Sequence, residues 1–357
     1  MNALFQTAPL AVFLACLALV VASSVVLSTA LDRVGSWLRL SAGLLGIITA
    51  LGADSPEIAS AIAALQAGSR DVGLGVIVGS NIFNLAALLG LTAIVAGDIA
   101  TDVPVVALSG GVGLFVLATI VLQLFGVIPA AVSLGLIALV FVPYVVLATL
   151  RPRQIAGLHM LSPAVRGFLA AALTPGERSP EQQRASACAV DESRPEEPVS
   201  GGPSVTTRAT FELLALVPAL FAIIAGSVGL VSTALILGAR QHVSQALTGA
   251  LVLAALTGIP NVVAAIRLAL HRRGAIVVSE ALNSNTINLI SGIAIPGVII
   301  GLGTPTAFAT FGIWWLFGSS AAVLALMLVR RHINRGYGIL IAFVWIVFAT
   351  VTIAIAH

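Results

Sequence analysis

The sequence predicts an all-α polytopic membrane protein of ten transmembrane helices, arranged as two inverted-topology five-helix repeats with helices broken at the membrane midplane. Composition, the length of the apolar segments and a recurring polar pattern lead to this prediction. Of the 357 residues, 59% are hydrophobic and 9% are charged, against about 25% charged in an average soluble domain. Such a chain cannot cover a water-facing surface, and its apolar segments are longer than a barrel strand requires.

The ten apolar segments are separated by short connections and by one longer polar stretch. They lie near residues 9–31, 40–67, 72–97, 103–123, 128–150, 210–238, 244–270, 275–302, 306–329 and 337–356. Residues 176–208 are rich in Pro, Ser, Glu and Arg, a composition that buries too little apolar surface to fold. We therefore expect a first repeat at 1–150, a cytoplasmic, partly disordered linker at 151–209, and a second repeat at 210–357. Residues 151–175 are expected on the membrane surface.

The first segment is predicted to be a membrane span and not a cleaved signal peptide. No basic residue precedes Arg33, and the apolar run is too long for a signal peptide. Cys16 and Cys188 lie far apart, one in a span and one in the linker, so they indicate neither a disulfide nor a metal framework.

The basic residues, all of them arginine, predict the orientation. With the N-terminus outside, the cytoplasmic connections collect most of the arginines, and only Arg70 and Arg240 fall on the opposite side. The positive-inside rule then favours both termini outside and the linker in the cytoplasm. A prokaryotic plasma membrane is the most economical location, because the chain shows no targeting signal.

A polar pattern recurs at a fixed offset of 204 residues. Pro56 corresponds to Pro260, and "VGSNIFNLA" at 78–86 corresponds to "LNSNTINLI" at 282–290. Five spans separate the two copies, so they enter the membrane in opposite directions, as in many secondary transporters whose sites lie at broken helices near the midplane. Each proline removes an N–H group and frees carbonyl oxygens.

Polar side chains lie close to each proline and again on the following helix. Asp54 and Glu57 are three residues apart and share a helical face, and in each copy a serine and an asparagine four residues apart share another. The polar positions 57 and 261 both precede their serine by 23 residues, so two re-entrant hairpins would place these groups at similar depth. The sequence therefore predicts a cage of carboxylate, amide, hydroxyl and backbone oxygens, which suits hard cations such as Ca²⁺ or Na⁺.

These motifs resemble those of the cation/calcium exchanger superfamily, which includes the sodium/calcium exchangers. The first copy reads "GADSPE" and "VGSNIFN", and the second, more divergent copy reads "LTGIPN" and "LNSNTIN". The resemblance implies an antiporter that moves Ca²⁺ against Na⁺ by alternating access, with the first and sixth helices moving past a core. The metal-binding residues that it implies, together with the polar residues of the two turns, are Glu57, Asp54, Ser80, Asn84, Thr257, Asn261, Ser284 and Asn288.

Three positions depart from the family pattern and bear on the coupling ion. Asn261 replaces the second glutamate, Asp54 replaces a turn serine, and Gly258 replaces the other one. Both acids then belong to the first copy, and two carboxylates this close disfavour each other's ionisation. A site of this kind could favour Na⁺ or H⁺ over Ca²⁺.

Individual polar residues also have plainer interpretations. Asp54 could cap a helix near Pro56, favoured by the helix dipole, and the asparagines could simply join helices, as polar residues often do in membranes. Glu280, one turn before Ser284, could extend a cation path. We favour an ion pair with Arg267, because unpaired charges inside membranes are rare.

Other functions are less favoured by the sequence. No histidine lies within the predicted spans, which argues against an intramembrane enzyme, and an internal repeat with broken helices is typical of a transporter and not of a channel. A proton-coupled or monovalent Na⁺/H⁺ antiporter, or a degenerate exchanger fold without transport, stay as alternatives. The expected partners are the lipid bilayer and the transported cations, with no cofactor and no nucleic acid. The sequence leaves the oligomeric state open.

Overall fold

The computed structural model describes residues 7–37, 47, 50–150, 154–155, 157, 160–173, 205–270 and 274–356. Most of the predicted linker, Cys188, and the predicted cytoplasmic arginines at 39, 151, 153, 272 and 273 lie outside these residues. The side chain of Arg267 is also outside them, so its ion pair with Glu280 stays a prediction.

The described chain is almost entirely helical. The elements of its first half are α2 (Pro9–Trp37), α4 (Ser55–Gln66), α5 (Arg70–Asn84), η1 (Leu85–Leu91), α6 (Thr92–Ala96), β1 (Asp98–Ala100), α7 (Val103–Val105), η2 (Val106–Gly110), α8 (Gly111–Leu124), α9 (Ala130–Thr149) and α11 (Pro163–Leu173). Those of its second half are α13 (Val205–Arg240), α14 (Gln245–Leu247), η3 (Thr248–Leu253), α15 (Ala254–Thr257), α16 (Ile259–Leu270), α17 (Gly274–Leu289), η4 (Ile290–Ala294), α18 (Ile295–Ile299), α19 (Ala307–Arg330), β2 (His332–Asn334) and α20 (Arg335–Ala356). The segments labelled η are π-helical.

Fewer than ten spans are confirmed. Within the described residues, seven helices are long and apolar enough to cross a membrane, or eight if the bent pair 245–257 and 259–270 is one span. The predicted span 40–67 is only partly described. The predicted span 275–302 is helical over 274–299 but carries several polar residues. Because most of α17 is buried inside the protein, it does not need the lipid-facing composition of an isolated span.

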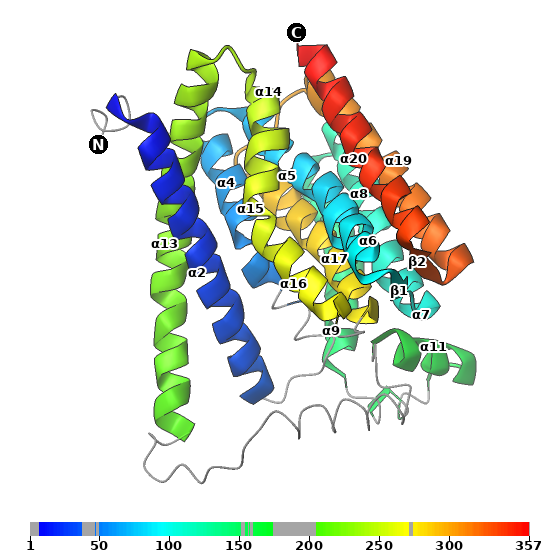
Figure 1. The fold of residues 1–357 in the computed structure, drawn as a ribbon. Helices are drawn as coiled ribbons and strands as arrows, with labels where there is room; N and C mark the ends of the chain where they lie inside the picture. The colour runs from blue at the N-terminus through cyan, green and yellow to red at the C-terminus, as the bar shows by residue number, and fades with distance from the viewer. Residues whose placement is uncertain are drawn as a thin grey trace.

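The long helices α2 and α13 lie side by side at one edge of the molecule, and α19 and α20 lie at the opposite edge (Figure 1). The shorter α4, α5, α15, α16 and α17 lie between them. The start of α2 and the end of α20 are at the same end of the molecule, whereas β1, β2, α7 and α11 are at the other end. α13 begins at Val205, five residues before the predicted start of the second repeat.

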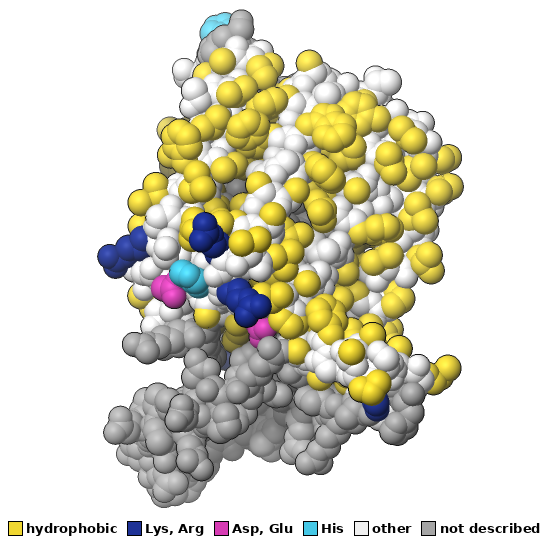
Figure 2. Space-filling model, turned by 90° about the vertical axis from the view of Figure 1, so that its right-hand side faces the viewer, with side chains coloured by type: hydrophobic (Ala, Val, Ile, Leu, Met, Phe, Trp, Pro, Cys, Tyr) yellow, Lys and Arg dark blue, Asp and Glu magenta, His cyan; other side chains and the backbone are white. Residues whose placement is uncertain are grey.

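The face formed by α19 and α20 is largely hydrophobic. Apolar side chains cover most of it, and charged side chains gather toward its lower end (Figure 2). Large apolar residues of α20 such as Phe343 and Ile346 are more than half exposed. An apolar surface of this size above a charged rim is the pattern of a protein that contacts lipid.

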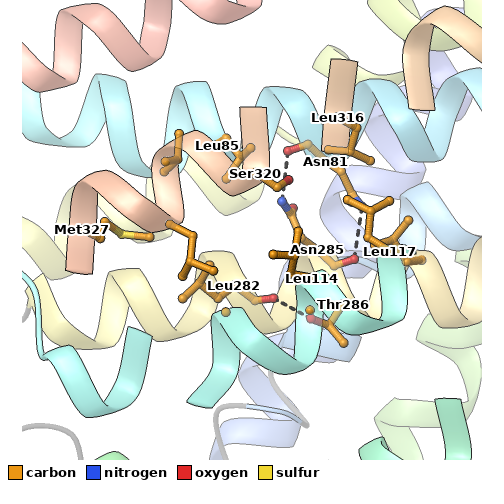
Figure 3. A pocket seen from close by; sticks show the side chains of 15 residues that line it. Asn81, Leu85, Leu114, Leu117, Leu282, Asn285, Thr286, Leu316, Ser320 and Met327 are labelled. Carbon is orange, nitrogen blue, oxygen red and sulfur yellow. Dashed lines mark hydrogen bonds between the residues drawn. The ribbon is translucent and has the colours of Figure 1, made fainter. Parts of the chain in front are cut away.

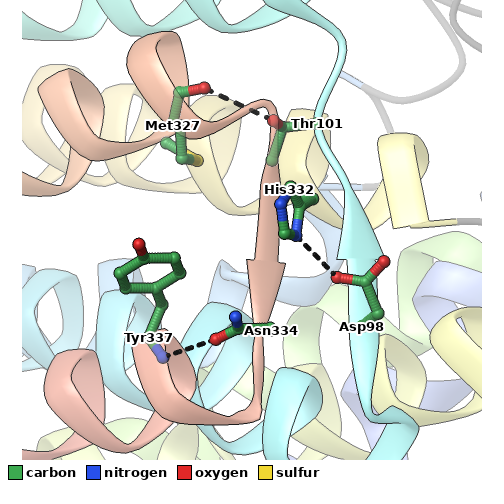
Figure 4. Close-up of polar contacts among 6 residues, drawn as sticks. All are labelled: Asp98, Thr101, Met327, His332, Asn334 and Tyr337. Atoms are coloured by element: carbon green, nitrogen blue, oxygen red, sulfur yellow. Dashed lines mark hydrogen bonds and ion pairs between the residues drawn. The ribbon is translucent and has the colours of Figure 1, made fainter.

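A short two-stranded antiparallel sheet lies at the end of the molecule where α7 and α11 are found. β1 pairs with β2 through Asp98 with Asn334, Ile99 with Ile333, and Ala100 with His332. His332 Nδ1 lies 3.3 Å from Asp98 Oδ1, and both side chains are at least half exposed (Figure 4). An exposed pair of this kind contributes little stability.

Glycines allow two helices to touch through their backbones at the centre of the fold. A Cβ atom at Gly79 of α5 would lie 2.7 Å from the Cα of Ala250 in η3, and one at Gly249 would lie 3.0 Å from the Cα of Val72. Gly75 faces Ala250 and Ala246 in the same way. The glycines of "DVGLGVIVGSN" at 71–81 permit this close contact, because they carry no Cβ atom.

Candidate functional site

The site forms where two helices are broken by a proline. Asp54 is the residue before α4, and Pro56 lies in the first turn of that helix, where its missing N–H group costs nothing. In the second half, α15 and α16 meet at Gly258 with a bend of 41°. α4 and α16 are related by the same offset of 204 residues that relates the two motifs.

The long helix α2 contacts the first helix break through a serine side chain. The Ser24 hydroxyl of α2 donates to the carbonyl oxygens of Gly52, at 3.4 Å, and Ala53, at 3.3 Å. These two carbonyls directly precede Asp54. The sequence reasoning missed this contact, and a serine inside an apolar helix was its only signal.

The second pair of helices brings the serine and asparagine residues to the breaks. α5 and α17 each carry one copy of the S-N-x-x-N motif, and each continues directly into a π-helical segment, η1 or η4. π-helical turns occur frequently at functional sites. Here they begin immediately after the last asparagine of the first motif and two residues after that of the second.

A chain of hydrogen bonds joins four of the predicted residues across the two halves. The Oδ1 atom of Asp54 accepts from Asn261 Nδ2 at 2.7 Å and from Ser284 Oγ at 2.8 Å. Ser284 Oγ in turn accepts from Asn84 Nδ2 at 2.9 Å. All four side chains are at most 2% exposed.

Asp54 therefore occupies a helix start without capping it. No hydrogen bond joins its side chain to the first turn of α4, and its carboxylate reaches across to the second repeat instead. The helix dipole still favours a negative charge at this position.

Three other predicted residues are fully buried and have no hydrogen-bond partner among the described residues. Their unpartnered atoms are both carboxylate oxygens of Glu57, the hydroxyl oxygen of Ser80, and the amide oxygen and nitrogen of Asn288. Leaving one buried polar atom unsatisfied costs about 1–3 kcal/mol, and more for a charged group. Glu57 lies three residues after Asp54, and both acids are fully buried.

A pair of asparagines joins α5 and α17 beside the site. Asn81 Nδ2 donates to the carbonyl oxygen of Asn285, and Asn285 Nδ2 donates to that of Asn81, both at 3.1 Å. Two identical bonds between residues 204 apart are what a two-fold relation between the copies produces. A cavity of about 30 Å³ adjoins the pair, and Ser320 and Thr286 also line it (Figure 3). In the sequence, Asn81 and Asn285 are matching positions of the repeated motif, and nothing there indicates that they are hydrogen-bonded to each other.

Two further buried hydroxyl groups belong to the helices of the site: that of Thr257, which the sequence predicted, and that of Ser60, which it did not. Thr257 is buried, and its hydroxyl donates to the carbonyl oxygen of Leu253 at 2.8 Å, which leaves the hydroxyl oxygen able to accept or to bind a cation. Ser60 is buried one turn after Glu57, and its hydroxyl has no partner in the part of the chain that the structure describes. A polar residue three positions after an intramembrane acid was the available signal for Ser60.

The arrangement combines two carboxylates with neutral amide and hydroxyl oxygens inside a buried volume. Oxygen ligands of this kind suit hard cations, and Ca²⁺ takes six to eight of them.

Comparisons with known proteins identify the family of the chain. A family model described as "Sodium/calcium exchanger protein" matches residues 8–151 and 211–354, one stretch in each half of the chain. Among curated proteins, "Putative antiporter CaxA" of Alkalimonas amylolytica is 41% identical over 81 residues, and "Inner membrane protein YrbG" of Escherichia coli is 44% identical over 57 residues. These matches span 22% and 16% of this chain and only 25% and 17% of the two relatives.

Solved structures share the fold at low sequence identity. A crystal structure of the H⁺/Ca²⁺ exchanger CAX matches with a TM-score of 0.65 at 14% identity, covering 98% of this chain and 86% of that one. Native YfkE gives a TM-score of 0.65 at 14% identity, with 98% and 94% coverage. A sodium–calcium exchanger, NCX_Mj, gives 0.59 at 19% identity, with 98% and 99% coverage.

The family match covers both halves of the chain and includes both pairs of motif helices. Solved exchangers share the fold over nearly the whole length of the chain. This multi-pass membrane protein therefore belongs to the sodium/calcium exchanger protein family, whose members are cation antiporters and not enzymes.

Proposed function

We propose that this protein is a secondary active antiporter that moves Ca²⁺ against Na⁺ by alternating access. The observation that carries the proposal is the pair of buried carboxylates, Asp54 and Glu57, among amide and hydroxyl oxygens at two proline breaks. Charges buried in a membrane protein are costly and mark ion pathways. The eight predicted residues form the cation site: the two acids supply the charge, and the other six surround it with neutral groups.

The proposal includes a ten-helix architecture with two inverted repeats, divided at 1–150, 151–209 and 210–357. It is supported by the offset of 204 residues shared by α4 and α16, and by the reciprocal bonds of Asn81 and Asn285. We place both termini outside and the linker inside a prokaryotic plasma membrane. The arginine distribution and the bacterial origin of the two curated relatives support this placement.

Proton coupling is the second candidate, and one observation favours it. Both acids belong to the first repeat and are fully buried three residues apart, while the second repeat supplies the neutral Asn261. Two carboxylates buried in one site are costly to ionise together, which makes them a natural carrier for H⁺. A fold shared with an H⁺/Ca²⁺ exchanger and with a sodium–calcium exchanger is compatible with either coupling ion.

The test is Ca²⁺ uptake into proteoliposomes, driven in turn by an outward Na⁺ gradient and an outward H⁺ gradient. Wild type is compared with Glu57→Gln, which removes the charge at nearly constant volume. Asp98→Asn serves as the matched control, because Asp98 is an exposed acid outside the site. We expect Na⁺-driven uptake that Glu57→Gln abolishes and Asp98→Asn preserves.

The other outcomes separate the alternatives. Uptake driven only by H⁺ would assign the coupling to the two acids. A Na⁺ gradient that drives H⁺ but not Ca²⁺ movement would indicate a monovalent antiporter. The absence of all cation movement would leave an exchanger fold without transport and would overturn the proposal.

A further inference from the structure

A second cavity, of about 310 Å³, lies away from the cation site, at the end of the molecule that carries the start of α2 and the end of α20. The span Val103–Leu124 begins at the β1–β2 end, so its last residues are at this opposite end. The last turn of α8, the α8–α9 connection, α18 and the connection from α18 to α19 form the cavity. We call it the terminal cavity. None of the eight predicted cation-site residues lines it.

The terminal cavity lies where lipid meets water. The apolar side chains of Val127 and Ile299 flank it and are mostly exposed, and α9, which begins at its edge, carries large exposed apolar residues such as Leu139. The half-exposed ring of Trp314 lies beside that of Phe125, with the centroids 5.8 Å apart. Tryptophan is enriched at the membrane–water interface. The cavity is therefore at the level of the lipid headgroups.

A glutamine places a hydrogen-bond acceptor in the terminal cavity. Gln123 lies over Gly297, and a Cβ atom on that glycine would collide with Gln123 Nε2. The Oε1 atom of Gln123 is buried and has no hydrogen-bond partner among the described residues. An unsatisfied buried acceptor is costly, so the cavity favours an occupant that can donate a hydrogen bond.

Charges of both signs lie at the rim of the terminal cavity. The exposed guanidinium of Arg70 lies against the lining residue Gly303, where a side chain would leave it no room. Within the described part of the chain, this guanidinium has no hydrogen bond or ion pair. The next residue, Asp71, accepts a hydrogen bond from the Thr306 hydroxyl at 2.8 Å. The rim therefore offers a cation and a carboxylate side by side.

We propose that the terminal cavity binds the headgroup of a phospholipid that carries a phosphate and a primary ammonium group, as phosphatidylethanolamine does. Arg70 pairs with the phosphate, to which a guanidinium is well matched. The ammonium group donates to Gln123 Oε1, and the carboxylate of Asp71 favours its charge. The acyl chains lie along the exposed apolar surface of α9. This inference does not depend on which cations the protein transports.

Other occupants match these groups less well. A headgroup with a net negative charge would be repelled by Asp71, and a free phosphate would leave the apolar flank unused. A choline headgroup has the phosphate, but its quaternary nitrogen has no N–H to donate to Gln123. The volume is at the low end of the range for ligand sites, about 300–1,000 Å³, which fits a headgroup and not a whole lipid.

Lipid titrations of the purified, delipidated protein in detergent test the proposal. Thermal unfolding is followed by tryptophan fluorescence at increasing mole fractions of phosphatidylethanolamine, phosphatidylcholine or phosphatidylglycerol with identical acyl chains. A lipid that binds only the folded protein raises the unfolding midpoint according to its affinity. For wild type, half of the maximal rise should need about ten-fold less phosphatidylethanolamine than phosphatidylcholine or phosphatidylglycerol, because only the first offers both the phosphate and a charged donor.

Two variants separate the roles of the polar groups. Gln123→Leu should remove the preference for phosphatidylethanolamine over phosphatidylcholine and leave the response to phosphatidylcholine within about two-fold of wild type. Arg70→Gln should weaken the responses to these two lipids alike, by about ten-fold, because both carry the phosphate. Arg331→Gln makes the same exchange at an exposed arginine at the β1–β2 end and should respond as wild type. If Gln123→Leu does not fold, Gly297→Ala, whose Cβ displaces the amide, should remove the same preference.

Three results would overturn the proposal. One is an equal midpoint rise with all three lipids in wild type and in the variants, which would indicate unspecific stabilisation by lipid. Another is a preference for phosphatidylcholine or phosphatidylglycerol that Gln123→Leu does not change. The third is stabilisation by free phosphoethanolamine at the concentrations at which the lipid acts, which would assign the cavity to a soluble phosphorylated amine.

Discussion

Replacing Gly79 with alanine tests the backbone contact that positions the site. The added Cβ would lie 2.7 Å from the carbonyl carbon and from the Cα of Ala250, and still closer to the carbonyl oxygen of that residue. Ordinary contacts begin at 3.4 Å, so α5 and η3 must separate by about 0.7 Å or more. A gap of that size forfeits a quarter to a half of the dispersion energy of the atoms along the contact.

The expected cost of Gly79→Ala is about 2–3 kcal/mol, in the upper part of the range for overpacking. The obstructing atoms belong to the backbone and cannot rotate away, unlike the end of a side chain. The free energy of unfolding is measured by titrating the purified protein with a denaturing detergent. Ca²⁺ binding should also weaken, because Gly79 directly precedes Ser80 on the same helix.

Gly111→Ala is the matched control. It makes the same exchange inside a helix, α8, where a Cβ meets no atom within 4 Å. Alanine is favoured over glycine in helices by about 0.5–1 kcal/mol, so this variant should be as stable as wild type or slightly more stable. A Gly79→Ala protein as stable as Gly111→Ala would refute the reasoning that the backbones touch.

Two further predictions follow from contacts and orientation. The Tyr144 hydroxyl donates a hydrogen bond to Asn283 Oδ1 at 2.7 Å inside the helical core. Tyr144→Phe should therefore lower the free energy of unfolding by about 0.5–2 kcal/mol. An unchanged free energy of unfolding in the same detergent titration would show that this bond does not stabilise the protein. The orientation is tested by placing single cysteines in a background without native cysteines. A cysteine at the half-exposed His332 should react with a membrane-impermeant maleimide only in inside-out vesicles, and one at the exposed Val127 only in right-side-out vesicles. The opposite labelling pattern would invert the proposed topology.

Much of the fold followed from composition and repetition. The apolar segments predicted a helical membrane protein, and the structure confirms seven or eight such spans among the described residues. The count of ten stays a prediction, because part of the predicted span 40–67 lies outside the described residues. Helices such as α17 face other helices and not lipid, so they carry polar residues that a count of apolar segments does not separate from true lipid-facing spans.

The sequence by itself determined the membrane class, the proline breaks and the identity of the polar residues near them. It also showed the offset of 204 residues, because a polar motif repeated in an apolar background is visible without any structure. Those features depend on residue type and spacing alone. They led to the exchanger family, which the family match confirms.

Only the tertiary structure decided which polar groups satisfy each other. From the sequence, Asp54 was a possible ligand or a helix cap, and Asn261 was the lost second acid. In the structure the two are hydrogen-bonded at 2.7 Å, although 207 residues separate them in the chain. That contact, and the absence of its counterpart at Gly258, depend on how two helix breaks face each other across the fold. No local pattern records that relation, because the packing of several helices fixes it together.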